Sequence, residues 1–96
     1  MMIITIAIPK GFTNITKLRA RLETAIASSD YNVVYCNNLT EDVFNLLHEK
    51  GCYVMETKPE KPHFLIAFWD EKEGEVKDII NECMKAGVRA KIINEV

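Results

Sequence analysis

Polar side chains able to bind a ligand stand at four points of the chain, each close to an apolar stretch. A lysine offers a positive charge to an anion, amides and carboxylates offer hydrogen bonds, and a tryptophan offers a flat apolar face. The predicted ligand-binding residues are Lys10, Gly11, Asn37, Asn38, Asp42, Trp69, Asp70 and Gly74. We expect no catalytic residue and no metal ligand among them.

The apolar pattern predicts that most of these residues follow the ends of β-strands, whereas Asp42 is expected in the first turn of a helix. Residues 64–69 form an unbroken apolar run, which is typical of a strand buried on both faces of a parallel sheet. Apolar residues then recur with helical spacing at Val76, Ile79, Ile80, Cys83 and Met84. Gly87 is expected to end that helix, and residues 90–93 to form another strand. Ligands of such strand–helix–strand units bind at the carboxyl ends of the strands.

The remaining segments predict the same alternation. Strands are expected at residues 2–8 and 32–36, with helices following Thr13 or Asn14 and over residues 41–50. The chain of 96 residues suits one domain, residues 1–96. The predicted fold is α/β, a minimal Rossmann-like three-layer sandwich with a mostly parallel sheet of four or five strands and three helices.

The segment 52–57 is harder to place. If it were a parallel strand at the far edge of the sheet, the chain would have to return and pass two strands sideways. That path is on the order of 20 Å, whereas the five residues that follow reach at most roughly 17 Å. We therefore expect either an antiparallel edge strand or the crossover itself.

Composition narrows the class of protein. A formal net charge of −2 argues against a generally basic nucleic-acid binder. No apolar stretch approaches the roughly 20 residues of a membrane helix, so no membrane association is expected. Three cysteines without a framework spacing favour free thiols and a cytoplasmic location.

Three segments, residues 6–13, 33–42 and 64–74, resemble the SLOG family. This Rossmann-like group includes the cytokinin-activating LOG phosphoribohydrolases and many nucleotide-sensing domains. The most specific segment is Phe-Leu-Ile-Ala-Phe-Trp-Asp at residues 64–70, followed by Gly74. It is similar to a family strand that ends in Phe-Trp-Asp-Gly. The resemblance is greatest to a small branch carried by phages and bacteria, which implies that a phage or a bacterium encodes the chain. If the gene is viral, the expected location is the host cytoplasm.

The chain departs from the family at its phosphate-binding loops. Ile8 stands in place of a glycine, and Cys36 and Asn37 in place of a glycine pair. The arginine and glutamate of the phosphoribohydrolases have no counterpart. The resemblance therefore implies non-catalytic binding of a nucleotide or nucleotide-derived ligand without a cofactor. In that hypothesis Trp69 stacks on the base and Asp70 bonds a ribose hydroxyl.

Each of these residues also has a structural interpretation. Trp69 can close the core at a strand end and Asp70 can cap a turn. Asp42 suits the dipole of a helix, and the two asparagines are good turn formers. The alternative function is a protein-interaction module that has lost its ligand site, and a homodimer or larger homo-oligomer is expected in either case. A small enzyme acting on a nucleoside or nucleotide is the least favoured hypothesis.

Other reactive residues favour structural roles. Cys36 has no histidine near it in the sequence, so a buried thiol is favoured over a nucleophile. His48 and Cys52 lack the spacing of a zinc site. The basic residues of the first helix are expected to form a solvated face, with Arg19 paired to Glu23 four residues on.

Overall fold

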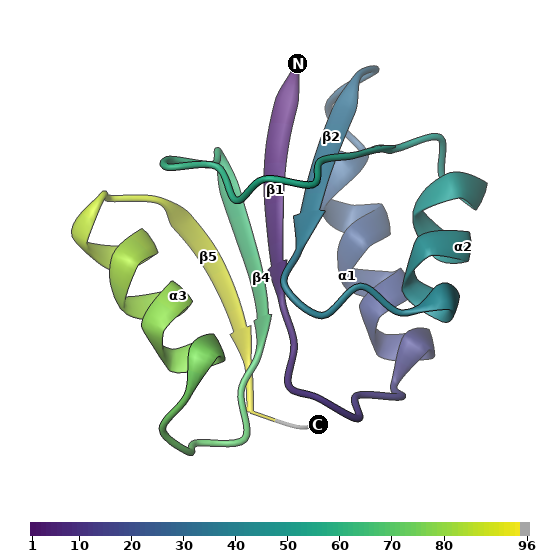
Figure 1. The fold of residues 1–96 in the computed structure, drawn as a ribbon. Coiled ribbons are helices and arrows are strands. Elements are labelled where there is room, and N and C mark those ends of the chain that lie inside the picture. The colour runs from purple at the N-terminus through teal and green to yellow at the C-terminus, as the bar shows by residue number, and fades with distance from the viewer. Residues whose placement is uncertain (95–96) are drawn as a thin grey trace.

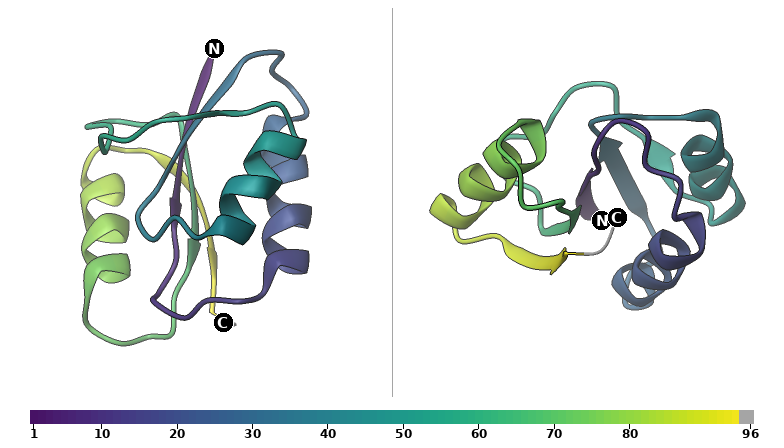
Figure 2. Two further views of the ribbon diagram at one scale, coloured as in Figure 1. Left: turned by 45° about the vertical axis from the view of Figure 1, so that its right-hand side comes forward. Right: turned by 90° about the horizontal axis from the view of Figure 1, so that it is seen from below.

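The computed structural model describes residues 1–94. Their elements, in chain order, are β1 (Met2–Ala7), α1 (Ile15–Ile26), β2 (Asn32–Cys36), α2 (Glu41–Glu49), β3 (Tyr53–Val54), β4 (Phe64–Phe68), α3 (Glu75–Lys85) and β5 (Arg89–Ile93). The five strands form one sheet in the order β3-β2-β1-β4-β5, and every neighbouring pair is parallel. Helices α1 and α2 cover one face of the sheet and α3 covers the other (Figures 1 and 2). The prediction of a minimal Rossmann-like α/β sandwich is thus confirmed.

The strands bury both of their faces because helices lie on both sides. Ile66 and Phe68 of β4 join the core cluster beneath α1 and α2, whereas Leu65 and Ala67 join the cluster beneath α3. Alternate residues therefore enter different cores, and both cores are apolar. This explains why β4 is an unbroken apolar run rather than an alternating one.

The helix ends follow the predicted local signals. The Asn14 side chain accepts a hydrogen bond from the backbone N–H of Lys17 and begins α1. Gly87 follows α3 with a φ of +73°, a left-handed conformation that glycine adopts without strain. None of the helices within residues 1–94 is long and apolar enough to cross a bilayer.

The expectation for residues 52–57 was wrong, because β3 is a parallel edge strand rather than an antiparallel strand or the crossover. It pairs with β2 over two residues only, so it ends early. The register places four residues at one level of the sheet, namely Val54, Val34, Ile4 and Phe64. The chain therefore leaves β3 at the level where β4 begins and moves only sideways. Three strand spacings are about 14 Å, and residues 55–63 can span about 30 Å.

We call residues 55–63 the connector. Lys58 in the connector forms an ion pair with Glu82 of α3, with 3.0 Å between Nζ and Oε2. The connector therefore approaches α3 and crosses between the two halves of the sheet without helical structure, as Figures 1 and 2 show. This is the position where a crossover helix would join two parallel strands in a longer fold.

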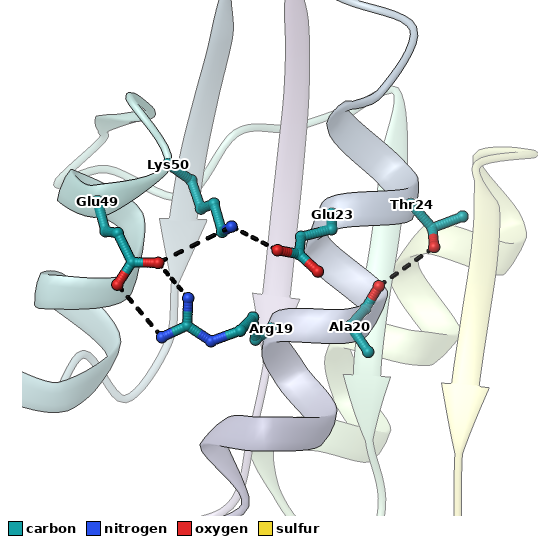
Figure 3. Close-up of polar contacts among 6 residues, drawn as sticks. All are labelled: Arg19, Ala20, Glu23, Thr24, Glu49 and Lys50. Atoms are coloured by element: carbon teal, nitrogen blue, oxygen red, sulfur yellow. Dashed lines mark hydrogen bonds and ion pairs between the residues drawn. The ribbon is translucent and has the colours of Figure 1, made fainter.

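Ion pairs join α1 to α2 on the solvent side. Arg19 pairs with Glu49, and Lys50 pairs with both Glu23 and Glu49 (Figure 3). The predicted Arg19–Glu23 pair along α1 was wrong, because the end of α2 presents a carboxylate to Arg19 and an ammonium group to Glu23. The Arg19 guanidinium lowers the pKa of the Glu49 carboxyl. Because these groups are exposed, their ion pairs contribute little to the free energy of folding. Their main effect is to fix how α1 and α2 face each other.

Candidate functional site

A cavity of about 400 Å³ opens at the carboxyl ends of β1, β2 and β4, the lower end of the sheet in Figure 1. Its walls come from the loop after β1, the loop after β2, the loop after β4 and the start of α3. The lining residues are Ile8, Pro9, Lys10, Asn38, Asp70, Lys72, Glu73, Gly74, Glu75 and Val76. We call this the carboxyl-end cavity.

Half of the predicted site residues line this cavity, namely Lys10, Asn38, Asp70 and Gly74. Gly11 and Asn37 line a neighbouring hollow that also contains Lys10 and Asn38. Asp42 and Trp69 lie outside the lining of both. Asp42 is exposed in the first turn of α2, where its charge complements the positive end of the helix.

The two asparagines fasten the end of β2 to the end of β1. Asn37 accepts a hydrogen bond from the Ile8 N–H at 2.8 Å, and its amide group donates to the Ile8 carbonyl at 3.0 Å. The same amide group donates to Glu75 Oε1 at 2.7 Å, and the Asn38 amide donates to the Ile8 carbonyl at 2.8 Å. Asn37 therefore joins β1, β2 and α3, and it holds two walls of the carboxyl-end cavity together.

Trp69 and Asp70 order the loop that follows β4. The Trp69 indole N–H donates to the Lys72 carbonyl at 2.9 Å, and Asp70 Oδ1 accepts from the Lys72 backbone N–H at 3.1 Å. The Trp69 ring packs against the core cluster beneath α3. These contacts agree with the structural interpretation, in which Trp69 closes the core at a strand end and Asp70 caps a turn. The second Asp70 carboxylate oxygen has no hydrogen-bond partner within residues 1–94, and Asp70 lines the cavity.

Two of the three carboxylates that line the carboxyl-end cavity accept hydrogen bonds from other side chains, whereas the two amines there are free. Glu73 accepts from Lys77 at 2.5 Å, and Glu75 accepts from Asn37. The ammonium groups of Lys10 and Lys72 have no ion-pair partner in the described part of the chain. The two lysines are therefore the groups available to an anion.

Sequence reasoning missed Lys72. It stands three residues after Trp69 in a loop that also contains Glu71 and Glu73, so its position alone does not separate it from ordinary loop charges. Glu71 adopts a φ of +64°, and this tight turn brings the Lys72 backbone onto Trp69 and Asp70. The side chain is thereby placed in the lining of the cavity.

The cysteines are poor nucleophiles. Burial raises the pKa of the Cys36 thiol to about 11, so it remains protonated at neutral pH. Burial also raises the pKa of Cys52 and of Cys83. Over the residues that the structure describes, no three histidine, cysteine, aspartate or glutamate side chains gather closely enough to hold a metal ion.

No family model, curated protein or solved structure matches this chain. Its function must therefore be argued from its own residues. The carboxyl-end cavity offers two amines, one free carboxylate oxygen and the N-terminus of α3, where Gly74 and Glu75 lie. Such a set suits a ligand with an anionic group and a hydroxyl group.

Proposed function

We propose that the carboxyl-end cavity binds a nucleotide or a nucleotide-derived ligand without transforming it, as the resemblance to the SLOG family implies. The observation that carries the proposal is the meeting of Lys10, Lys72 and Asp70 in one cavity. The free ammonium groups suit a phosphate, and the free Asp70 oxygen suits a sugar hydroxyl. A volume of about 400 Å³ lies within the range of small-molecule sites.

The state of Cys36 supports binding rather than catalysis. Burial keeps this thiol protonated, so it is a poor nucleophile at the end of β2. The carboxylates near the cavity also disfavour a ligand with many phosphates, because like charges repel. A mononucleotide or an ADP-ribose derivative suits this balance.

Removing the two free amines tests the proposal. Native mass spectrometry and calorimetry with mononucleotides, cyclic di- and trinucleotides and ADP-ribose would identify a bound class. The Lys10→Gln/Lys72→Gln variant is expected to weaken that binding by at least about tenfold, because each charge-assisted hydrogen bond to a phosphate is lost. Asp70→Asn is the companion variant, since asparagine can still accept from the Lys72 N–H.

The matched control is Lys85→Gln, which removes a lysine charge at the far end of α3. It should bind as the wild type does. Trp69→Ala is unsuitable as the primary test, because Trp69 packs against the core and would alter stability. A wild-type protein that retains no member of the panel would contradict the proposal, and so would a double variant that binds as tightly as the control.

We also propose that the β3 edge joins a second copy of the chain or a partner protein. Tyr31 and Tyr53 are stacked with their ring centroids 4.9 Å apart, yet they remain 47% and 59% exposed. Tyr53 is the first residue of β3, a strand of two residues whose outer edge is unpaired within the described chain, and Tyr31 stacks on it. Exposed aromatic rings at a sheet edge are suited to association. Tyr53→Lys should then reduce the mass measured by sedimentation equilibrium to that of one chain, and a monomeric wild type would contradict a homo-oligomer.

A reducing cytoplasm is the proposed location, in the host cell if a phage encodes the chain. Cys36, Cys52 and Cys83 are free thiols and all three are buried. Buried free thiols need no oxidising environment for stability, unlike the cysteines of small secreted domains. The three cysteines would then count as core residues rather than reactive ones.

A further inference from the structure

A second cavity, of about 620 Å³, opens at the other end of the sheet, between α1 and the edge strand β5. We call it the basic groove. Its lining residues are Met2, Arg21, Thr24, Ala25, Ser28, His63, Phe64, Arg89 and Lys91. They come from the amino ends of β1, β4 and β5 and from one flank of α1. The carboxyl-end cavity shares none of these residues.

The topology creates the basic groove. Ile93 of β5 belongs to the core cluster beneath α1 and α2, so Arg89 and Lys91, at two-residue intervals, point to the same face. Within residues 1–94 no helix covers β5 on that face, because α1 and α2 lie over the other strands and α3 lies on the opposite face (Figure 2). The space beside α1 therefore stays open and receives the basic side chains of β5.

The groove contains positive charge without compensation. Arg21, Arg89 and Lys91 have no ion-pair partner among residues 1–94, and the lining includes no aspartate or glutamate from that part of the chain. The other flank of α1 is different, because Arg19 and Glu23 each meet an opposite charge from α2 (Figure 3). Three unpaired cations in one groove are notable in a chain whose net charge is −2.

His63 adds a hydrogen-bond donor. Its Nδ1 atom accepts a hydrogen bond from the Ile3 N–H at 2.9 Å. In the neutral ring the proton must then be on Nε2, which has no partner in the described chain and belongs to a residue that lines the groove. The same hydrogen bond fixes the ring at the junction of β1 and β4.

The floor of the groove is apolar. Met2, Ala25 and Phe64 are half-buried and pack against the core cluster beneath α1 and α2. The Phe64 side chain is therefore anchored from below and lines the groove on its other side. The aromatic ring of a ligand that packs on Phe64 would gain apolar contact area. An anionic group attached to that ring would reach the guanidinium groups of the basic groove.

We propose that the basic groove binds a small phosphate ester that contains an aromatic ring. The arginines and Lys91 hold the phosphate, His63 donates a further hydrogen bond, and the ring lies against Phe64 and Met2. Arginine suits this role because its planar donors match phosphate oxygens in pairs. The inference is independent of the function proposed above, since the two sites use different residues at opposite ends of the sheet.

The test uses 1-naphthyl phosphate as the probe, with inorganic phosphate and 1-naphthol as its two halves. Amide chemical shifts of the full-length protein are followed by NMR during titration. Naphthyl phosphate is expected to shift the amides of the groove, including Ala25, Phe64 and Lys91, and to bind at least about tenfold more tightly than either half. The Arg21→Gln/Arg89→Gln variant is expected to weaken binding by at least about tenfold.

The matched control is Lys85→Gln, which removes a lysine charge at the end of α3 and lies outside the lining of both cavities, so it should bind naphthyl phosphate as the wild type does. Binding at the basic groove is read from the shifts of Ala25, Phe64 and Lys91, which separates it from binding at the carboxyl-end cavity. Four results would overturn the inference. They are shifts confined to residues 70–76, binding unchanged in the arginine variant, equal binding of naphthol, and no binding at about 10 mM, where even a dissociation constant of about 1 mM would give nearly full occupancy.

Discussion

Replacing Asn37 with aspartate is expected to lower the free energy of unfolding by roughly 2–4 kcal/mol at pH 7. The variant keeps the acceptor for the Ile8 N–H but loses the donor to the Ile8 carbonyl and to Glu75. A carboxylate at this position would lie against a carbonyl oxygen and a second carboxylate. Equilibrium unfolding in urea, followed by circular dichroism, measures the effect.

The loss of stability in the Asn37→Asp variant should depend on pH in a defined direction. The introduced carboxyl group would have a pKa raised in the folded state above its value of about 4 in the unfolded chain, because its charged form is repelled. The deficit relative to the wild type is therefore smallest below about pH 4 and grows as the pH rises through the raised pKa. Asn81→Asp, on the exposed side of α3, is the control and should change stability by less than about 0.5 kcal/mol. A deficit that is absent at pH 7, or equal at all pH values, would contradict the bridging role of Asn37.

Truncating Phe68 to alanine is expected to cost about 3–5 kcal/mol of stability. The Phe68 side chain is fully buried in the cluster beneath α1 and α2, and its ring centroid lies 4.7 Å from that of Phe12. A cavity would remain where the ring was, since β4 is held in the middle of the sheet between β1 and β5. The loss is a large part of the stability of an ordinary small domain. The midpoint of thermal unfolding should fall accordingly.

The same substitution should loosen the carboxyl-end cavity. Phe12 lies just after Lys10 and Gly11, and its ring fixes that loop against Phe68. Amide exchange at residues 10–13 should therefore accelerate more in Phe68→Ala than in the exposed control Phe44→Ala, whose side chain is 45% exposed. Phe44→Ala should cost less than about 1 kcal/mol. Equal losses in the two variants would show that the Phe12–Phe68 contact contributes little.

Most of the fold could be predicted because its signals are local. The apolar run of β4, the capping residue Asn14 and the helix-ending Gly87 each act within a few residues of their own position. The direction of β3 could not be predicted in this way. It depends on a strand of two residues that ends level with the start of β4, and no neighbouring residue signals that coincidence.

The candidate site was predicted less completely, since its contacts join distant segments. The sequence indicates that Lys10, Asn38, Asp70 and Gly74 belong to the ends of strands, and the structure places them around one cavity. It does not indicate that Asn37 reaches Glu75, which is 38 residues away. The basic groove was missed for the same reason. The sequence alone indicates that Arg21 is a solvated helix residue. Only the strand order of the sheet places β5 beside it.

The connector links two parts of the molecule that lie on either side of the β1–β4 pairing. On one side lie β1, α1, β2, α2 and β3, and on the other lie β4, α3 and β5, so each part is contiguous in the chain. The two parts meet through the parallel pairing of β1 with β4, the packing of Phe12 on Phe68 and the hydrogen bond from Asn37 to Glu75. Both parts also contribute residues to each core cluster. A cut in the connector would leave the five described strands whole. The fold is therefore organised as two complementary fragments, and among the described strands the β1–β4 pairing is the one that their reassembly would have to restore.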